Sequence, residues 1–375
     1  MSDRHDIKPL GEGTYGSVIE VDISGQRYAE KTYREVGCPS SVRELSFLRK
    51  ISHPNIITLA KVTIKDNTTK ALLEICDSDL DTYFRIQRSE EIMIKVFHSI
   101  LCVVDFMHSK NLVHGDLTAH NILMKRGVVK LADFGAVREA GKHDLITTTV
   151  PWRAPEALVA RRHTLAIDMW SVGVIFMDCA TAEEIVPQRV SKEQNAVESV
   201  FLRLGCPANW KYRDSLSAKQ QQYPVKELDI KNYAKYKKVE LLNELLRGCL
   251  QIDETKRLTA TQALDLPLFA GMERVKGSWE EDFSKPIFPL PQVSEELSKL
   301  FPMVTKDKLQ RLFTFTQAVE KHMALSEGVL KACFYIVSAL GDDDDQMSDW
   351  LEDPYDFKYH AELTEVLKML DFRLL

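Results

Sequence analysis

The sequence of 375 residues contains no CxxC motif, and its seven cysteines are odd in number and widely scattered. This pattern argues against a disulfide framework and a zinc ribbon, and it favours a reducing compartment. No run of 18 apolar residues occurs, so we expect no transmembrane helix and no membrane partner. The charged start MSDRHDIKPL lacks the apolar core of a secretory signal peptide. The sequence therefore predicts an intracellular protein, either cytoplasmic or nuclear.

An excess of basic residues is also missing. The 49 Lys and Arg residues are outnumbered by 55 Asp and Glu residues, which gives a formal net charge of −6. A dedicated nucleic-acid binder would show a basic excess, so we expect no nucleic-acid partner. Hydrophobic residues make up 45% of the chain and charged residues 28%, which excludes wholesale disorder. At roughly 150 residues per domain, the length predicts two or three domains.

The hydrophobic pattern predicts mainly short strands, with one helix, up to about residue 75, and mainly helices from residue 80 onward. Alternating apolar residues, separated by turn residues such as Ser24-Gly25, predict strands. The predicted strands cover 17–23, 27–32, 56–64 and 71–75. Apolar residues at helical spacing predict helices over 40–51 and 91–108, and the mostly apolar run 167–180 predicts a buried helix. A β-rich part is thus followed by an α-rich part.

The last hundred residues differ from the rest. Residues 271–291 end in Pro286-Ile-Phe-Pro289-Leu-Pro291, which can form neither a helix nor a central strand and predicts an extended linker. Residues 292–375 show helical spacing again. The four adjacent carboxylates of Asp342–Asp345 repel one another, so we expect them in a solvated loop.

Three glycines near the start form a GxGxxG pattern, at Gly11, Gly13 and Gly16. In a dinucleotide-binding fold such glycines open a helix within a βαβ unit. Here they lead into the alternating strand 17–23, which excludes an NAD-binding oxidoreductase. A glycine-rich hairpin instead brings backbone N–H groups close to nucleotide phosphates, because positions without a side chain allow a close approach.

A lysine and a glutamate follow the hairpin. Lys31 ends the next predicted strand, and Glu44 lies thirteen residues later in the predicted helix 40–51. Alone they could form a solvated surface pair that contributes little. After a glycine-rich hairpin, they indicate a lysine that grips the α- and β-phosphates and a glutamate that holds it in place.

The segment His114–Asn121 and two later tripeptides supply the residues that phosphoryl transfer needs. Asp133-Phe134-Gly135 begins seventeen residues after Asp116, and Ala154-Pro155-Glu156 follows. Asn121 and Asp133 offer hard oxygen ligands for Mg²⁺. Asp116 is predicted to lie near the acceptor hydroxyl as the catalytic carboxylate. Any one tripeptide could occur by chance, but the whole ordered set is very improbable as a chance event.

Over residues 1–270 the sequence resembles a eukaryotic-type protein kinase and is most similar to cyclin-dependent kinases. The segments that carry this similarity are 38–44, which resembles the PSTAIRE helix shortened by one residue, 53–56, 73–80, 168–173 and 201–207. The resemblance implies an α+β bilobal fold, with a β-rich N-lobe over about 1–75 and an α-helical C-lobe over about 80–270. It implies a serine/threonine kinase that uses ATP and Mg²⁺ and acts on protein substrates.

The resemblance also assigns roles to single residues. It makes Asp116, Lys31 and Glu44 catalytic and Asn121 and Asp133 metal ligands. The residues implied to bind the nucleotide are Gly11, Glu12, Gly13, Gly16, Val18, Ala29, Lys31, Leu73, Glu74, Cys76 and Leu123. Among these, Leu73 would be the gatekeeper, Glu74 and Cys76 would give backbone hydrogen bonds to adenine, and Val18, Ala29 and Leu123 would enclose the ring. The resemblance further implies inhibitory phosphorylation at Thr14 and Tyr15 and a buried pair between Glu156 and Arg257.

The sequence departs from the family pattern in its catalytic and activation segments. Gly115 replaces an arginine that helps to bind an activation-loop phosphate. We hypothesise that Asp144, facing Arg43 and Arg138, replaces that phosphate permanently, although a disordered loop explains the sequence equally well. Thr118 replaces a lysine that contacts the γ-phosphate, which leaves a pseudokinase or nucleotide-binding scaffold as the alternative.

Two further departures concern the substrate. Thr118-Ala119 resembles the tyrosine-kinase motif as much as the serine/threonine one, so a dual-specificity kinase stays open. Pro151 stands where the family has tryptophan, which leaves the preference for the following substrate residue undefined.

The helical tail 292–375 faintly resembles the later helices of a cyclin box. If it is one, it would act as an activator in cis, because a tethered helix reaches millimolar effective concentration. The alternatives are a cyclin-like activator in trans and a tail that only packs on the kinase and stabilises it.

Overall fold

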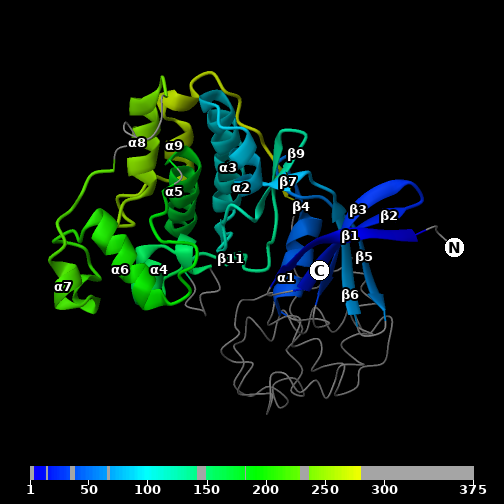
Figure 1. Cartoon of the computed structure of the whole chain (residues 1–375), viewed down its shortest axis with the longest axis horizontal. Coiled ribbons are helices and arrows are strands. Elements are labelled where there is room, and N and C mark those ends of the chain that lie inside the picture. Colours follow the sequence, from blue (N-terminus) through cyan, green and yellow to red (C-terminus); the bar gives the residue numbers. More distant parts are fainter. Residues whose placement is uncertain are drawn as a thin grey trace, which may run out of the picture. The chain divides into compact units, whose positions relative to one another are not determined.

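The computed structural model describes residues 4–13, 16–33, 39–65, 68–141, 149–181, 183–228 and 236–279 (Figure 1). The predictions for Thr14, Tyr15, Asp144 and the tail 292–375 lie outside the described residues. The described residues divide into two compact units. The N-terminal unit contains 4–52, 57–75 and Trp279, and the C-terminal unit contains 53–56 and 76–278.

The N-terminal unit is built on an antiparallel sheet of five strands in the order β1-β2-β3-β6-β5. The strands are β1 (Arg4–Gly13), β2 (Gly16–Ile23), β3 (Gln26–Tyr33), β5 (Leu59–Lys65) and β6 (Thr68–Glu74). Ser24 and Gly25 both have positive φ, at 55° and 86°, as a two-residue hairpin turn with the right twist requires. The turn predicted there is confirmed.

One helix, α1 (Pro39–Lys50), packs its apolar side chains in this unit. Its Leu45, Phe47 and Leu48 are buried, as the helical spacing predicts. The Phe47 ring lies 5.8 Å from the ring of Trp279. Trp279 ends β12 (Ser278–Trp279), which pairs with β4 (Ile51–Ser52). The first part of segment 271–291 is therefore folded where the sequence predicts a linker, because a large aromatic ring there finds an apolar partner.

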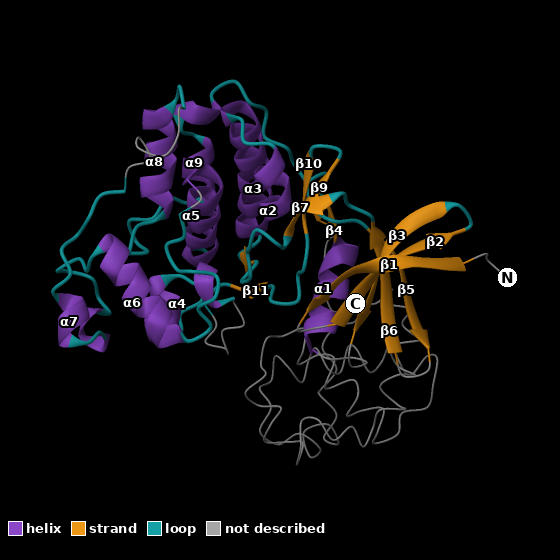
Figure 2. Cartoon of the chain, in the orientation of Figure 1, coloured by secondary structure: helices purple, strands orange, loops and turns teal. Residues whose placement is uncertain are grey.

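The C-terminal unit is mainly helical (Figure 2). Its helices are α2 (Leu80–Ile86), α3 (Glu90–Ser109), α4 (Pro155–Ala160), α5 (Ala166–Thr181), α6 (Glu193–Leu204), α7 (Ala218–Gln221), α8 (Val239–Cys249) and α9 (Ala260–Leu264), with short 3₁₀ turns at Val150–Trp152, Arg213–Ser215 and Pro267–Phe269. Short strands form two small sheets, one of β7 (Ser78–Asp79), β9 (Ile122–Lys125) and β10 (Val128–Leu131), the other of β8 (Leu112–Val113) and β11 (Arg138–Glu139). A β-rich region followed by a helical one confirms the predicted α+β class.

Two apolar helices form the core of the C-terminal unit. Ser89 caps the start of α3 by accepting a hydrogen bond from the amide of Ile92. Phe97 of α3 and Phe176 of α5 meet edge to face, with ring centroids 4.9 Å apart. By length and composition α3 could cross a membrane, but 61% of its apolar window is buried inside the fold. That burial is the pattern of a core helix.

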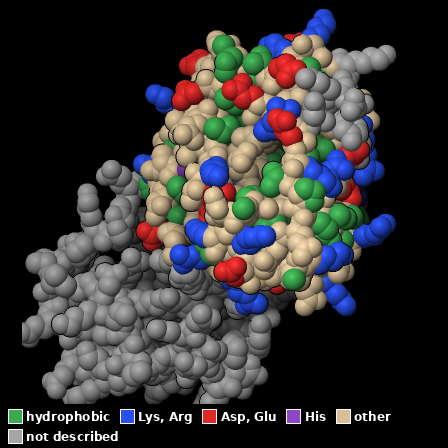
Figure 3. All heavy atoms as spheres, turned by 90° about the vertical axis from the view of Figure 1, so that its left-hand side faces the viewer, with side chains coloured by type: hydrophobic (Ala, Val, Ile, Leu, Met, Phe, Trp, Pro, Cys, Tyr) green, Lys and Arg blue, Asp and Glu red, His purple; other side chains and the backbone are tan. Residues whose placement is uncertain are grey.

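Charged residues on the surface of this unit occur with both signs. Figure 3 shows basic and acidic side chains interspersed on the face that carries α6 and α7 in Figure 1. The Lys219 ammonium, for example, lies 2.8 Å from a carboxylate oxygen of Glu198. The five described cysteines, Cys76, Cys102, Cys179, Cys206 and Cys249, are free thiols, as their scatter predicts.

One half-buried acid is expected to make the unfolding of this unit depend on pH. Burial, with smaller contributions from Glu184 and Asp81, raises the pKa of Asp178 in α5 to about 8. Since the folded state holds this proton more tightly than the unfolded state, Asp178 lowers stability as pH rises from about 4 to about 8. We expect Asp178→Asn, which mimics the neutral acid, to be more stable than the wild type at pH 9 by on the order of 2–4 kcal/mol and equal to it at pH 4. Thermal unfolding of both proteins across this range tests the expectation, and parallel curves would contradict it.

Candidate active site

The residues predicted to contact the nucleotide from the N-terminal unit share one face of its sheet. Val18 of β2 lies opposite Lys31 of β3, and Ala29 of β3 lies opposite Leu73 of β6. Opposite residues in antiparallel strands point to the same side, as do residues two apart in one strand. Val18, Ala29, Lys31 and Leu73 therefore point to the same side of the sheet, as a shared ligand would require.

The fold requires glycine at Gly16 of the β1–β2 hairpin but not at Gly11. A Cβ added at Gly16 would lie 2.0 Å from the carbonyl oxygen of Thr32, so only glycine fits there. A Cβ at Gly11 would meet nothing within 4 Å, so the fold itself does not require glycine at this position. Gly13 lies opposite Gly16 in the hairpin register, and Glu12 is exposed beside it. Open space above Gly11 is what a backbone that approaches a phosphate would need.

Lys31 and Glu44 form a buried ion pair. The Lys31 ammonium lies 2.7 Å from Oε2 of Glu44, and the Tyr33 hydroxyl donates to the same oxygen at 3.0 Å. The two charged side chains are only 10% and 2% exposed. The predicted pairing is therefore present, and it is no solvated surface pair. A buried charge without its partner is costly, so each residue constrains the other.

Loss of the Glu44 charge is expected to weaken nucleotide binding. Glu44→Gln removes the charge that Glu44 places 2.7 Å from the buried Lys31 ammonium, so we expect the ammonium to shift away from its present position. We predict an increase of about tenfold in KM for ATP, which corresponds to about 1.4 kcal/mol. Tyr33→Phe is the matched control, because it removes only the hydroxyl on the same oxygen. An unchanged KM in Glu44→Gln would show that the pair has no role in binding.

In the C-terminal unit, Asp116 is held between two other side chains. The backbone N–H and the hydroxyl of Thr149 both donate to Oδ1 of Asp116, each at 2.8 Å. The side-chain amide of Asn121 donates to the backbone carbonyl of Asp116 at 2.9 Å and approaches Oδ2 of Asp116 at 3.4 Å. Burial raises the pKa of Asp116 although the Thr149 hydrogen bonds oppose the shift. The carboxylate is thus oriented through Oδ1, while Oδ2 has only the longer contact with Asn121.

The backbone before Asp116 is anchored by Asp168 of α5. The Asp168 carboxylate accepts hydrogen bonds from the amides of His114 and Gly115, at 2.8 and 3.0 Å. Burial alone would raise the pKa of Asp168, but the contact with His108 and the other hydrogen bonds outweigh it and lower the pKa. Gly115 has φ +78°, and a Cβ there would lie 2.9 Å from the Ala136 carbonyl oxygen. Glycine at this position therefore suits the backbone conformation of the loop.

Thr118 has a structural role in the same loop. Its hydroxyl accepts a hydrogen bond from the backbone N–H of Asn121 at 3.1 Å, and its side chain is buried. The residue thus stabilises the turn that carries Asn121. Thr118 offers no cation to a phosphate, so the charge that the family's lysine would supply is missing at this position.

The two predicted metal ligands lie in neighbouring segments. The Ala132 amide donates to the Asn121 carbonyl at 2.8 Å, which ties the chain just before Asp133 to Asn121. Asp133 has φ +60°, a conformation that is uncommon outside glycine. The described residues contain no group of three or more His, Cys, Asp or Glu that could hold a metal ion. The side-chain oxygens of Asn121 and Asp133 are of the kind that Mg²⁺ takes, since this ion is usually bound by one or two carboxylates together with substrate phosphates and water.

The remaining predicted nucleotide contacts come from both units, Glu74 from the N-terminal one and Cys76 and Leu123 from the C-terminal one. Glu74 ends β6, and its amide already donates to the Thr58 carbonyl at 3.0 Å. Cys76 is half-buried and lies in the C-terminal unit. Leu123 lies in β9, opposite Asp79 of β7. The proposed contacts of these three residues with adenine stay predictions.

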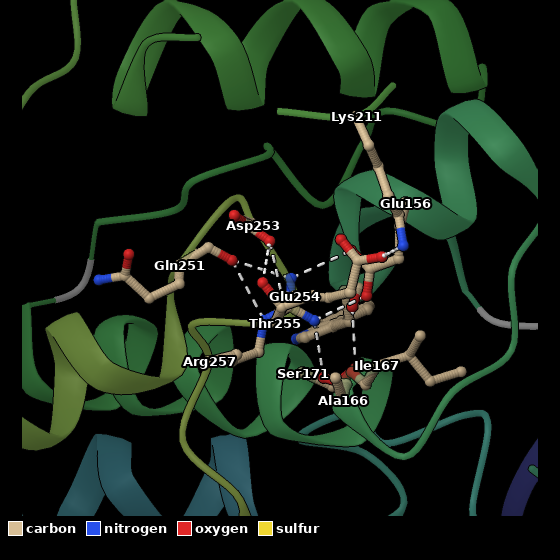
Figure 4. Close-up of polar contacts among 11 residues, drawn as sticks. Glu156, Ala166, Ile167, Ser171, Lys211, Gln251, Asp253, Glu254, Thr255 and Arg257 are labelled. Atoms are coloured by element: carbon tan, nitrogen blue, oxygen red, sulfur yellow. Dashed lines mark hydrogen bonds and ion pairs between the residues drawn. The ribbon is translucent and has the colours of Figure 1, made fainter. Parts of the chain in front are cut away.

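A second predicted pair, Glu156 with Arg257, is confirmed (Figure 4). The Arg257 guanidinium donates to both carboxylate oxygens of Glu156, at 2.7 and 3.0 Å, and neither side chain is exposed. The same guanidinium also donates to the carbonyls of Ala166 and Gln251. The pair thus ties the start of α4 to the loop between α8 and α9.

The model of the protein kinase domain matches residues 4–269 of the chain. The chain belongs to the protein kinase domain family. Its kinase domain has the sheet-rich N-terminal region and helical C-terminal region described above, and the family chemistry is phosphoryl transfer to protein substrates. Protein kinase domains generally use ATP and Mg²⁺. The match ends before the tail 292–375.

Thr149 is a hydrogen-bond partner of Asp116 that sequence reasoning missed. Its position five residues before Ala154-Pro155-Glu156 was available as a signal. We expect Thr149→Val to lower kcat by about tenfold or more, because Asp116 then loses a hydroxyl donor that orients it. Thr149→Ser keeps the hydroxyl and should retain most of the activity. Equal kcat values for the two variants, measured at saturating ATP, would contradict this role.

Proposed function

We propose that this kinase transfers the γ-phosphate of ATP to serine or threonine residues of protein substrates. The observation that carries the proposal is the Asp116 carboxylate, held through Oδ1 by Thr149 and approached by Asn121. An oriented carboxylate can accept a hydrogen bond from an acceptor hydroxyl and take its proton during transfer. The intact Lys31–Glu44 pair supports a bound nucleotide in the same protein.

Each residue has a distinct task in this mechanism. Lys31, fixed by Glu44, would hold the α- and β-phosphates as a point charge. Asn121 and Asp133 would hold Mg²⁺, which when bound neutralises charge on the β- and γ-phosphates. Asp116 would align the acceptor hydroxyl and receive its proton. Catalysis then rests mainly on positioning and charge neutralisation.

The alternative is a pseudokinase that binds nucleotide without turnover. Thr118 favours it, because its hydroxyl serves the turn at Asn121 and no cation stands at this position. A missing charge near the transferred phosphate removes one transition-state contact. We favour an active enzyme because Asp116, Asn121 and Asp133 are all present and Thr149 orients the Asp116 carboxylate.

We also propose cyclin-dependent-kinase-like regulation, on the sequence of residues 38–44 and 168–173. An activator would act on α1, which carries Glu44. The candidate in cis is the tail 292–375, and a cyclin-like protein in trans is the other. Deleting 292–375 should abolish activity and leave the kinase domain folded, whereas an active truncated protein would overturn activation in cis.

Phosphoamino acid analysis tests the residue class. The full chain, Mg²⁺ and γ-labelled ATP are incubated with three peptide libraries that differ only in a central Ser, Thr or Tyr. The proposal predicts label on Ser and Thr. Label on Tyr as well would indicate the dual-specificity alternative, and label on Tyr alone would contradict the proposal.

A further inference from the structure

A pocket of about 720 Å³ lies within the C-terminal unit, apart from Asp116 and its partners. Its walls come from the end of α3, the start of α5 and the loop and helix that follow α8. The apolar part of the wall includes Leu165, Met169 and Leu258. A pocket of this size can hold a ligand much larger than one polar group.

A buried carboxylate, Glu254, lines this pocket (Figure 4). Its side chain is only 6% exposed, and its Oε1 lies 2.5 Å from the ammonium of Lys211. Among the described residues, its Oε2 has no hydrogen-bond partner. A buried carboxylate with an unused oxygen is costly, because each oxygen can accept hydrogen bonds.

Lys211 is a partner that can be displaced. Its side chain is 51% exposed, in contrast to that of Glu254. A flexible ammonium binds as a single point, whereas a guanidinium can donate to both oxygens of one carboxylate. An incoming guanidinium could therefore use Oε1 and Oε2 while Lys211 moves into solvent.

The other charged groups of the wall leave the pocket negative once Lys211 moves. Arg257 is neutralised by Glu156, and His108 is engaged by Asp168. Asp105 adds a second carboxylate, which accepts a hydrogen bond from the neutral hydroxyl of Thr261. Two carboxylates beside an apolar wall favour a ligand that combines a cation with an aliphatic group.

We propose that this pocket is a docking site for a protein segment that presents an arginine next to an aliphatic side chain. The arginine pairs with Glu254 in place of Lys211, and the aliphatic side chain packs among Leu165, Met169 and Leu258. Charge complementarity and the apolar wall select this occupant over an acidic or purely polar segment. The site is independent of phosphoryl transfer, so its test needs no turnover.

Calorimetric titration of the full chain with acetyl-Leu-Arg-amide tests the proposal. We expect saturable binding that is lost in Glu254→Gln and about tenfold tighter in Lys211→Met, where the competing ammonium is gone. Acetyl-Leu-citrulline-amide, which lacks the charge, should not bind. A purely structural Lys211–Glu254 pair predicts no tightening in Lys211→Met, so this variant decides the matter even if Glu254→Gln fails to fold.

Three results would overturn the proposal. They are unchanged binding in Glu254→Gln, unchanged or weaker binding in Lys211→Met, and binding of agmatine as tight as that of the dipeptide. The last result would mean that the apolar wall contributes nothing to binding and that the pocket takes a small guanidinium compound.

Discussion

Asp116→Asn is expected to lower kcat by about 10²–10⁴-fold, the range that a positioned proton acceptor contributes. Asparagine can occupy the same space and still accept from Thr149 through its carbonyl oxygen, but it cannot take the proton of the acceptor hydroxyl. The loss should therefore appear in kcat, with KM for ATP little changed. Steady-state phosphorylation of a generic protein substrate measures both parameters.

The stability of the Asp116→Asn variant is its own control. Burial raises the pKa of Asp116, so the ionised form carries a cost in the folded state that the neutral amide avoids. The variant should unfold at the same temperature as the wild type or at a higher one. Near-normal kcat in a folded variant would remove Asp116 from the mechanism.

Arg257→Met is expected to destabilise the kinase domain by about 3–5 kcal/mol, because it leaves the carboxylate of Glu156 buried and uncompensated. Both side chains are fully buried, and the guanidinium also satisfies two backbone carbonyls. At about 2–4 °C per kcal/mol for a domain of this size, the unfolding temperature should fall by roughly 10 °C. Calorimetry or circular dichroism can follow the transition.

A surface pair provides the matched control. Lys219 lies against Glu198 with its side chain 73% exposed, so Lys219→Met should change stability by less than about 1 kcal/mol. Adding Glu156→Leu to Arg257→Met should recover part of the loss, since it removes the uncompensated charge. An Arg257→Met variant as stable as Lys219→Met would contradict the role assigned to the buried pair.

Local pattern was enough to predict the elements and pairs that depend on short-range geometry. Strand-like patterns predicted four of the five strands of the sheet, β2, β3, β5 and β6, but gave no range for β1. Helical spacing predicted α1 and α3, and a mostly apolar run predicted α5. The Lys31–Glu44 pair was predictable because a strand and the next helix carry it. Glu156 with Arg257 came from family resemblance alone, since no local signal links residues 101 positions apart.

Contacts that require distant segments to meet could not be predicted. Thr149 bonds to Asp116 across 33 positions, and that contact depends on how the chain between them is routed. Thr118 was interpreted as a missing lysine and as part of a tyrosine-kinase-like motif, and neither interpretation showed that its hydroxyl supports the Asn121 turn. Gly115 was interpreted only as a missing arginine, because the sequence around it does not show that its backbone has a positive φ. Trp279 was placed in a linker because the sequence cannot show that Phe47 is available to it.

The central claim is that this kinase domain turns over. The most direct measurement follows transfer of labelled γ-phosphate from ATP to a protein substrate by the full chain, with and without Mg²⁺, alongside calorimetric binding of ATP. The account predicts many phosphoserine or phosphothreonine products per enzyme molecule, dependent on Mg²⁺. ATP binding without any transfer beyond that of the Asp116→Asn variant would contradict it and identify the chain as a pseudokinase.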